Sequence, residues 1–263
     1  MRLLPDIGYL DEHVRFPFPP AESANRNGIV CYGGRLSPGL LLSAYRQGIF
    51  PWPSNPRIMQ WCSPDPRFVI PSGFLHVSES ARRRIRKVLA SRSGYRLTLD
   101  TAFRDVITAC ASVPRPGQDG TWIFPELIEA YTDLHRRGYA HSVELWNKDA
   151  LIGGLYGVSL GAAFFGESMF SRESNASKTA FLVLAMTLFE RGFEFIDCQV
   201  YTHYLELMGA ILIPRRQYLA MLAHALQKQD LKGPWPLFFP EFPDAETIMS
   251  RLHTWRSPLM DDR

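Results

Sequence analysis

The residues from 141 to 200 contain the pattern that most restricts the fold of this chain. Three segments that alternate with period 2 are followed by an apolar stretch of helical length and then by one more strand-like segment. In order they are His141–Trp146, Leu151–Val158, Ala162–Phe165, Ser177–Arg191 and Phe193–Val200. With the helices that we predict before and after this stretch, the order favours an α/β (α+β) fold with a mixed sheet flanked by helices. By analogy, this order resembles that of a GNAT-like acyltransferase domain.

The last strand of this stretch carries two polar residues on one face. Side chains alternate along a strand, so Asp197 and Gln199 point the same way, with Cα atoms about 7 Å apart. Polar groups in so apolar a strand need hydrogen-bond partners. One interpretation is a site in which Asp197 accepts from the Gln199 amide and leaves the Gln199 carbonyl free for a substrate proton. The alternative is that the two residues cap neighbouring backbone at the strand's end.

Composition places the chain among ordinary globular proteins and indicates no special chemistry. Hydrophobic residues make up 46% of its 263 residues, and the formal net charge of +3 permits a nucleic-acid partner without implying one. No apolar run is long enough to cross a bilayer and no signal-peptide core opens the chain, so we expect a cytoplasmic protein that binds no membrane. The four cysteines are far apart and predict buried thiols, and we expect neither metal nor cofactor.

The N-terminal region differs in composition from the rest. Residues 1–73 are rich in proline and aromatic residues and predict a small β-rich domain, with the boundary near 71–73, before a catalytic domain over 74–263. Near the C-terminus, the aromatic segment 234–240 predicts packing on the core, and 244–255 predicts a short amphipathic helix.

A basic helix is predicted just after that boundary. Ile85, Val88 and Leu89 share one helical face, which turns the cationic side chains to solvent. An exposed cationic face can bind the phosphates of a nucleic acid, or it can simply be solvated. The cationic candidates are Arg82, Arg83, Arg86 and Lys87.

Several blocks, in unbroken order from Gly33 to Leu222, together resemble the leucyl/phenylalanyl-tRNA–protein transferases. They are Gly48-Ile-Phe-Pro-Trp52, Trp61-x-Ser-Pro-Asp-Pro-Arg67, Thr121-Trp-Ile123, Gly166-Glu-Ser-Met-Phe-Ser-Arg172, Asn175-Ala-Ser-Lys-Thr179, Asp197-Cys-Gln199 and Gly209-Ala-x-x-Ile-Pro-Arg-Arg216. The Gln/Arg-x-x-Gly-x-Gly/Ala pattern with which GNAT enzymes hold acetyl-CoA is absent, and Arg172 to Ser177 stand in its place. This departure argues against CoA as the donor.

The resemblance implies transfer of Leu or Phe, with Met as a further donor, from aminoacyl-tRNA to proteins with N-terminal Arg or Lys, which marks them for N-degron degradation. We also expect a monomer that needs no cofactor. The catalytic residues would be Gln199 and Asp197, and the basic helix would face the tRNA acceptor stem. The substrate-binding residues would be Glu167, Ser168, Trp52 and Trp122, with an apolar donor pocket of Leu155, Val158, Phe164 and Phe170.

Two other functions remain open from the residues alone. One is an enzyme that builds cell-wall peptides from aminoacyl-tRNA, which would need a muropeptide acceptor. The other is an RNA-binding module without catalysis, in which Trp52 and Trp122 stack on bases beside the basic helix.

Overall fold

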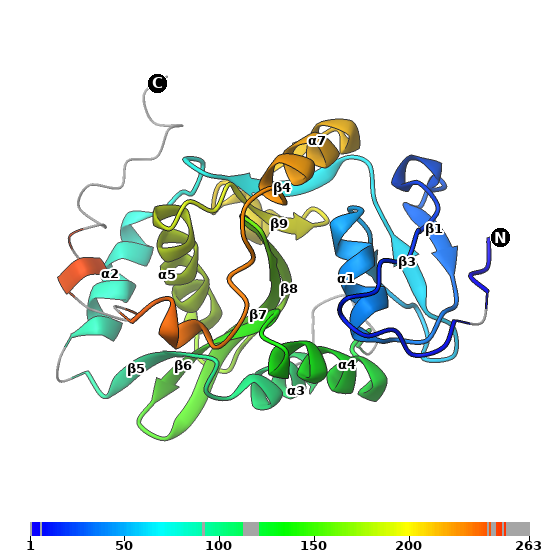
Figure 1. Cartoon of the computed structure of the whole chain (residues 1–263). Helices are drawn as coiled ribbons and strands as arrows, with labels where there is room; N and C mark the ends of the chain where they lie inside the picture. Colours follow the sequence, from blue (N-terminus) through cyan, green and yellow to red (C-terminus); the bar gives the residue numbers. More distant parts are fainter. Residues whose placement is uncertain are drawn as a thin grey trace.

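A computed structural model describes residues 2–5, 7–90, 93–112, 121–240, 242, 246–248 and 250 (Figure 1). Near the N-terminus, three short strands pair antiparallel in the order β1-β3-β2. They are β1 (Ile29–Tyr32), β2 (Phe50–Pro51) and β3 (Gln60–Cys62), and they accompany η1 (Ala21–Ser23) and helix α1 (Pro38–Arg46). The N-terminal region is therefore β-rich, as predicted.

A larger sheet forms the centre of the molecule. Its strands, in spatial order, are β10 (Ile211–Ile213), β4 (Arg67–Pro71), β9 (Phe195–Gln199), β8 (Ala163–Ser171), β7 (Ala150–Leu160), β6 (Ala140–Asn147) and β5 (Tyr95–Leu99). Among these strands β8 and β9 pair parallel, whereas the other neighbours pair antiparallel. The predicted mixed sheet flanked by helices is confirmed.

Helices cover both faces of this sheet. The helices that follow β4 along the chain are α2 (Glu79–Leu89), α3 (Phe103–Ser112), α4 (Pro125–Arg136), α5 (Ala176–Glu190), α6 (His203–Glu206) and α7 (Arg215–Ala225), with η2 (Trp235–Leu237) after them. Figure 1 shows α2 and α5 together on one side and α1, α3 and α4 on the other. The buried side chains form two clusters accordingly, one with α2 and α5 and one with α1, α3 and α4.

Helix α5 is buried on almost every side, which follows from its sequence. A helix that is apolar all around needs a covered position, and α5 lies between the sheet and α2. Gly153 in β7 lets it approach closely, because a Cβ at that position would lie 2.5 Å from the Ala176 Cβ. The parallel pairing of β8 and β9 depends on α5, since a parallel connection needs a long crossover.

Most elements lie where the periodicity predicts them. The three antiparallel strands are confirmed as β6, β7 and β8, although β8 continues to Ser171, well beyond the predicted end at Phe165. The buried aromatic segment is confirmed as well, since Trp235 is fully buried. The helix predicted over 244–255 falls mostly outside the described residues.

The division of the chain at residue 73 stays a prediction. Strand β4 lies before residue 73 in the chain, yet it pairs with β9 and β10, which lie after it, so the two predicted domains share the large sheet. The four cysteines are free and buried, as predicted. In the described part of the chain, no helix has the length and apolar character needed to cross a membrane.

Candidate active site in a fork between two strands

The candidate site lies where two neighbouring parallel strands, β8 and β9, separate. Strands β8 and β9 pair from Ala163 with Phe195 to Phe165 with Asp197, and no later pair joins them. Beyond this point β8 follows β7, with Ser168 opposite Tyr156. A cavity of about 410 Å³ occupies the fork that the two strands leave open.

The wall of the cavity is mostly apolar with a few polar groups, as is typical of small-molecule sites. Its apolar end includes Leu155, Phe181 and Ile196, which belong to the core cluster on the α5 side. Its polar end includes Glu167 and Gln199. The cavity therefore passes through the sheet from one core toward the other. The remaining lining residues are Pro51, Trp52, Trp122, Tyr156, Gly166, Ser168, Met169, Cys198, Val200, Thr202, Tyr204 and Leu205.

The structure brings together several of the residues that the sequence singled out. Those that line the cavity are Trp52, Trp122, Leu155, Glu167, Ser168 and Gln199. They come from segments up to 147 positions apart in the chain, from 52 to 199.

Three residues of the predicted donor pocket do not line the cavity. Val158, Phe164 and Phe170 are buried in the cores instead. Phe164 packs against Trp235, with ring centroids 5.6 Å apart, and Phe170 lies opposite Gly154 in β7. Of the four predicted pocket residues, Leu155 is the one on the cavity wall.

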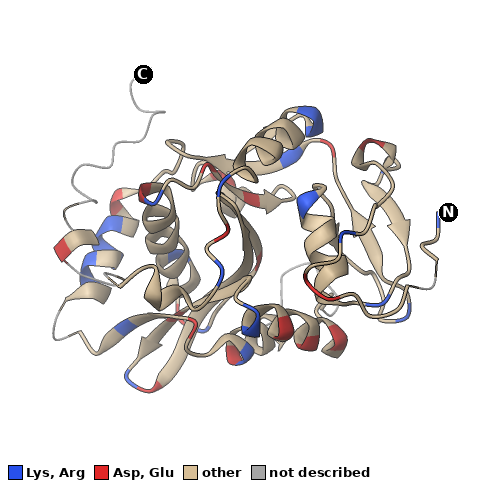
Figure 2. Ribbon diagram, in the orientation of Figure 1, with Lys and Arg blue, Asp and Glu red and all other residues tan. Residues whose placement is uncertain are grey.

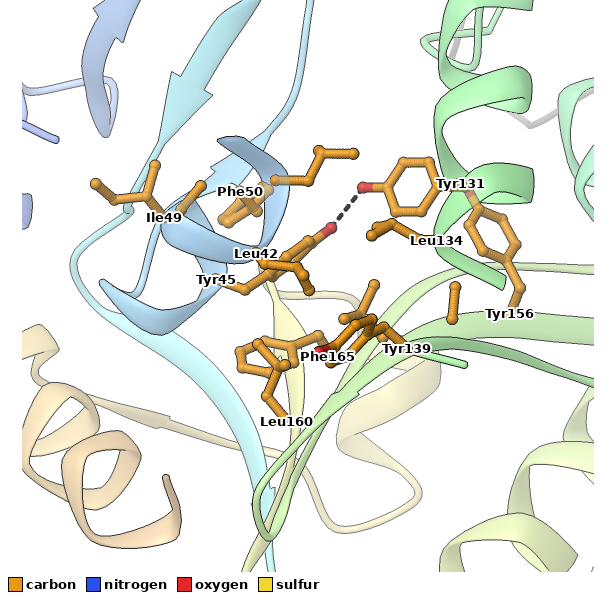
Figure 3. Close-up of a cluster of buried hydrophobic side chains, with 14 of the residues drawn as sticks. Leu42, Tyr45, Ile49, Phe50, Tyr131, Leu134, Tyr139, Tyr156, Leu160 and Phe165 are labelled. Carbon is orange, nitrogen blue, oxygen red and sulfur yellow. Dashed lines mark hydrogen bonds between the residues drawn. The ribbon is translucent and has the colours of Figure 1, made fainter. Parts of the chain in front are cut away.

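The Glu167 carboxylate is held by groups from three other elements. Tyr45 of α1 donates its hydroxyl to Oε1 at 2.8 Å, and Tyr131 of α4 donates to Oε2 at 2.9 Å. The Gln199 amide nitrogen donates to Oε1 at 2.7 Å. The two tyrosine hydroxyl oxygens also lie within hydrogen-bond distance of each other, and they face one another in Figure 3.

Burial is the main influence on the charge of Glu167, whose exposed fraction is 8%. Loss of hydration raises the pKa of this carboxyl to about 7, and the nearby negative charge of Asp197 also raises it. The hydrogen bonds from Tyr45, Tyr131 and Gln199 favour the charged form and act in the opposite direction. Glu167 therefore changes its charge close to neutral pH.

Asp197 lies behind the cavity wall in a buried ion pair. The Arg67 guanidinium donates from Nε to Oδ1 at 2.9 Å and from Nη2 to Oδ2 at 2.6 Å. Tyr218 of α7 donates its hydroxyl to Oδ2 at 2.8 Å. The guanidinium lies between the rings of Phe50 and Tyr218, at 4.6 and 4.4 Å from their centroids. Its Nη1 donates to the Gly48 carbonyl at 3.2 Å. The Asp197 carboxylate thus has a cationic partner and a hydrogen-bond donor on each oxygen.

Gln199 has an unusual backbone. Its φ is +64°, in the left-handed region that residues other than glycine rarely adopt. Its backbone N–H donates to Asp197 Oδ1 at 2.9 Å, which helps to hold this conformation. The predicted bond from the Gln199 side-chain amide to Asp197 is wrong, because that amide turns to Glu167 while Arg67 and Tyr218 occupy Asp197.

The predicted basic helix is α2, and its apolar face is confirmed. Ile85 and Val88 are buried, whereas Arg83 and Lys87 are exposed. The other two candidates make local contacts, since the Arg82 Nε donates to the Val77 carbonyl at 3.1 Å and Arg86 lies 3.6 Å from Glu79. Lys and Arg residues mark α2 in Figure 2. The helix packs on α5, which supplies Phe181 to the cavity.

Sequence reasoning did not assign to the site several residues that build it, among them Arg67, Tyr45, Tyr131, Phe181 and Ile196. Arg67 begins an apolar strand, and a charge in that position is a signal, because a buried arginine needs a carboxylate partner. Tyr45 and Tyr131 occupy apolar helix faces, where a hydroxyl requires a partner when buried. Phe181 and Ile196 gave no signal, because they read as ordinary core residues.

Comparisons with known proteins point to one family. The family model "Leucyl/phenylalanyl-tRNA protein transferase" matches residues 69–223, and the model of that family's N-terminal domain matches residues 34–65. A leucyl/phenylalanyl-tRNA–protein transferase from Myxococcus xanthus is 52% identical over 225 residues, which cover 86% of this chain and 94% of the relative. One from Syntrophus aciditrophicus is 51% identical over 83% of this chain and 89% of its own length.

Among solved structures, a GCN5-related N-acetyltransferase from Kribbella flavida aligns with 70% of this chain and 64% of its own, at 10% identity and a TM-score of 0.33. The sequence comparisons decide the family. Since one family model covers more than half of the chain and half of all aligned residues are shared with relatives of similar length, the chain belongs to the leucyl/phenylalanyl-tRNA–protein transferases and is an aminoacyltransferase.

Proposed function

We propose that this enzyme transfers Leu or Phe, with Met as a further donor, from aminoacyl-tRNA to the α-amino group of proteins that begin with Arg or Lys. The observation that carries the proposal is the cavity in the fork, which has an apolar end at Phe181 and Ile196 and a polar end at Gln199 and Glu167. The transferred residue would mark the acceptor for N-degron degradation. Relatives of this chain are named as transferases between leucyl- or phenylalanyl-tRNA and protein.

The apolar end would hold the donor side chain. Leu155, Met169, Phe181 and Ile196 offer a surface on which Leu or Phe loses its contact with water, at a gain of about 25 cal/mol per Å². Trp52 and Trp122 on the same wall offer rings for stacking on the terminal adenosine of the tRNA.

The polar end would hold the attacking amine. Because the Gln199 amide nitrogen donates to Glu167, its carbonyl oxygen is fixed and available to accept from an amine. The amine attacks the carbonyl carbon of the ester, the new C–N bond forms, and the C–O bond to the ribose breaks. The ester is already activated, so positioning supplies much of the acceleration.

An acceptor with N-terminal Arg or Lys would be favoured by negative potential near the amine. Asp197 is neutralised by Arg67, so the carboxylate that lines the cavity, Glu167, is the stronger candidate. The basic face of α2 would bind the acceptor stem through the exposed Arg83 and Lys87, since cations that meet phosphates release counterions.

The test of donor and acceptor is transfer of labelled leucine from charged tRNA to two model proteins that differ only in their first residue, Arg or Ala. We expect transfer to the Arg protein and little to the Ala protein. Equal transfer to both would refute the acceptor part, and RNA binding without transfer would refute the enzymatic part. Transfer to a muropeptide instead would identify the cell-wall class.

Two variants test the roles of residues. Gln199→Ala should lower kcat by about 100-fold or more, because the amine loses its acceptor and Glu167 loses a donor. Full activity in this variant would remove Gln199 from the mechanism. The double variant Arg83→Glu with Lys87→Glu should raise KM for aminoacyl-tRNA and reduce its salt dependence, whereas Arg136→Glu on α4, an exposed cation outside α2, should not.

A further inference from the structure

The hydroxyls and the carboxyl behind Gln199 form a closed triangle. Tyr45 contacts Glu167 Oε1, Tyr131 contacts Glu167 Oε2, and the two hydroxyls contact each other. Tyr45 and Tyr131 are fully buried and Glu167 is 8% exposed, so the three groups are hydrogen-bonded mainly to one another and to Gln199. The triangle thus contains three hydrogen-bond contacts among three groups.

Counting protons shows that this triangle has room for one more. Each tyrosine hydroxyl has a single hydrogen to donate. When Glu167 is ionised, both hydrogens point to its oxygens and the contact between the tyrosines has no proton. When Glu167 is protonated, its O–H can donate to Tyr131, Tyr131 to Tyr45, and Tyr45 to the other carboxyl oxygen. A proton that arrives at Glu167 is therefore fully hydrogen-bonded, which a buried polar group requires.

The proposed reaction needs such a destination for a proton. The α-amine of a protein has a pKa of about 7.7–8.0, so near neutral pH it arrives mostly as an ammonium, which cannot attack. The Gln199 carbonyl can accept a hydrogen bond but is a poor base. Asp197 does not line the cavity, and Arg67 and Tyr218 occupy its oxygens. Of the described residues that line the cavity, Glu167 is the one with a carboxyl group.

We propose that Glu167 is the proton acceptor for the attacking α-amine, and that Tyr45 and Tyr131 are positioning residues that hold its carboxyl and complete the hydrogen bonds of the proton it receives. This inference rests on the proposed function and adds to it a catalytic group for the same site. Gln199 then orients the amine, while Glu167 takes its proton.

The step balances in protons and bonds. The ammonium gives one proton to the Glu167 carboxylate, which becomes a neutral carboxylic acid, and the neutral amine attacks the ester carbon. As the C–O bond breaks, the second proton of the amine goes to the ribose oxygen and leaves a tRNA hydroxyl. Glu167 returns its proton to solvent after the peptide product leaves, because the cavity is then open to water.

The surroundings of Glu167 suit this exchange. A general base works best when its pKa lies near the operating pH, and burial raises the pKa of Glu167 to about 7. The ionisable groups that influence it are Tyr45 from α1, Tyr131 from α4 and Asp197 from β9, with Arg67 from β4 paired to Asp197. Burial is the largest of these influences, and Asp197 adds to it in the same direction.

The first test reads the proton directly and needs no transfer activity. Infrared difference spectra of the wild-type enzyme, taken from about pH 5 to about pH 9, should contain a buried carboxylic acid band that disappears with a midpoint near neutral pH. The band should be lost in Glu167→Gln and kept in Glu144→Gln. Glu144 of β6 is a matched control because its carboxyl is also buried, and burial raises its pKa as well. A Glu167 that stays ionised, or stays protonated, over the whole range would overturn the proposal.

The second test uses the pH dependence of single-turnover transfer to an acceptor with N-terminal Arg. Glu167→Gln keeps the shape of the side chain and cannot accept the proton, so transfer should fall by about 10²–10⁴-fold at pH 7. The deficit should shrink as the pH rises above about 8, where the amine is already neutral. Glu144→Gln should show a transfer rate with the pH profile of the wild type.

The outcomes separate the two proposals. A deficit in Glu167→Gln that is equal at every pH would indicate a structural role and refute the proton acceptor, even if transfer is established. Absence of transfer in the wild-type enzyme would refute the proposed function, while the infrared titration would still decide whether Glu167 exchanges a proton.

Discussion

Replacing Arg67 should cost this enzyme a large part of its stability. Arg67 and Asp197 have side chains that are 1% and 0% exposed, and two hydrogen bonds join them. In Arg67→Met the apolar part of the side chain still fits between Phe50 and Tyr218, but the Asp197 carboxylate is left buried with a single hydroxyl donor, that of Tyr218, and the Gln199 N–H.

The magnitude follows from the burial of both partners. Removing one member of a buried ion pair leaves an uncompensated charge and costs about 3–5 kcal/mol. Arg67 also loses its bonds to the Gly48 carbonyl and the Tyr218 hydroxyl, at 3.2 Å each, which are weaker by length. We therefore expect Arg67→Met to lower the free energy of unfolding by roughly 4 kcal/mol.

Urea unfolding followed by circular dichroism measures this loss. The double variant Arg67→Met with Asp197→Asn should lose less than the sum of the two single variants, by about 0.5–3 kcal/mol, because no charge is then left unpaired. A loss below about 1 kcal/mol in Arg67→Met, or strict additivity in the double variant, would show that the pair is not what stabilises this end of the sheet.

Three further predictions follow from the buried residues of the site and its surroundings. Folding raises the pKa of Glu167 from 4.5 to about 7, so between these pH values the folded state binds more protons than the unfolded state. The free energy of unfolding of the wild type should therefore fall by roughly 3 kcal/mol as the pH rises from 4.5 to about 7. Glu167→Gln should remove this slope in unfolding measured at several pH values; an unchanged slope would contradict the assignment. Phe181→Ala enlarges the apolar end of the cavity and should raise kcat/KM for Phe relative to Leu by about tenfold. The ratio is measured with both charged tRNAs in competition, and an unchanged ratio would place the donor side chain elsewhere. Trp235 is fully buried and does not line the cavity. Trp235→Ala should therefore lower the free energy of unfolding by about 3–5 kcal/mol, measured by heat or urea, and leave kcat unchanged at low temperature. A loss below about 0.5 kcal/mol, as for a surface residue, would contradict its role in packing.

The periodicity of the sequence was enough to place most of the elements. Apolar residues that repeat every 3.6 or 2 positions report local burial, and local burial determines helix and strand limits. The end of β8 was the main exception, because Glu167 and Ser168 interrupt the apolar alternation although the strand continues to Ser171. Those polar residues face a cavity rather than solvent or core, a distinction that periodicity cannot make.

The same limit applies to the site. Sequence reasoning indicated Trp52, Trp122, Leu155, Glu167, Ser168 and Gln199, all of which line the cavity. It did not separate these residues from Val158, Phe164 and Phe170, which are equally apolar but lie in the cores. Whether an apolar side chain packs on a neighbour or borders a cavity depends on what lies opposite it, and that is set by other segments.

Sequence by itself determined most of the helices and strands, the basic face of α2 and the family of this protein, because each depends on local patterns or on motifs shared with relatives. The tertiary structure alone decided that β9 lies between β8 and β4. That order opens the fork beside Gln199, and it brings Arg67 to Asp197 across 130 positions of the chain. Strand order depends on long-range pairing, in which segments far apart compete for the same neighbours, so the partners of Glu167 and Asp197 could be known only once the sheet was assembled.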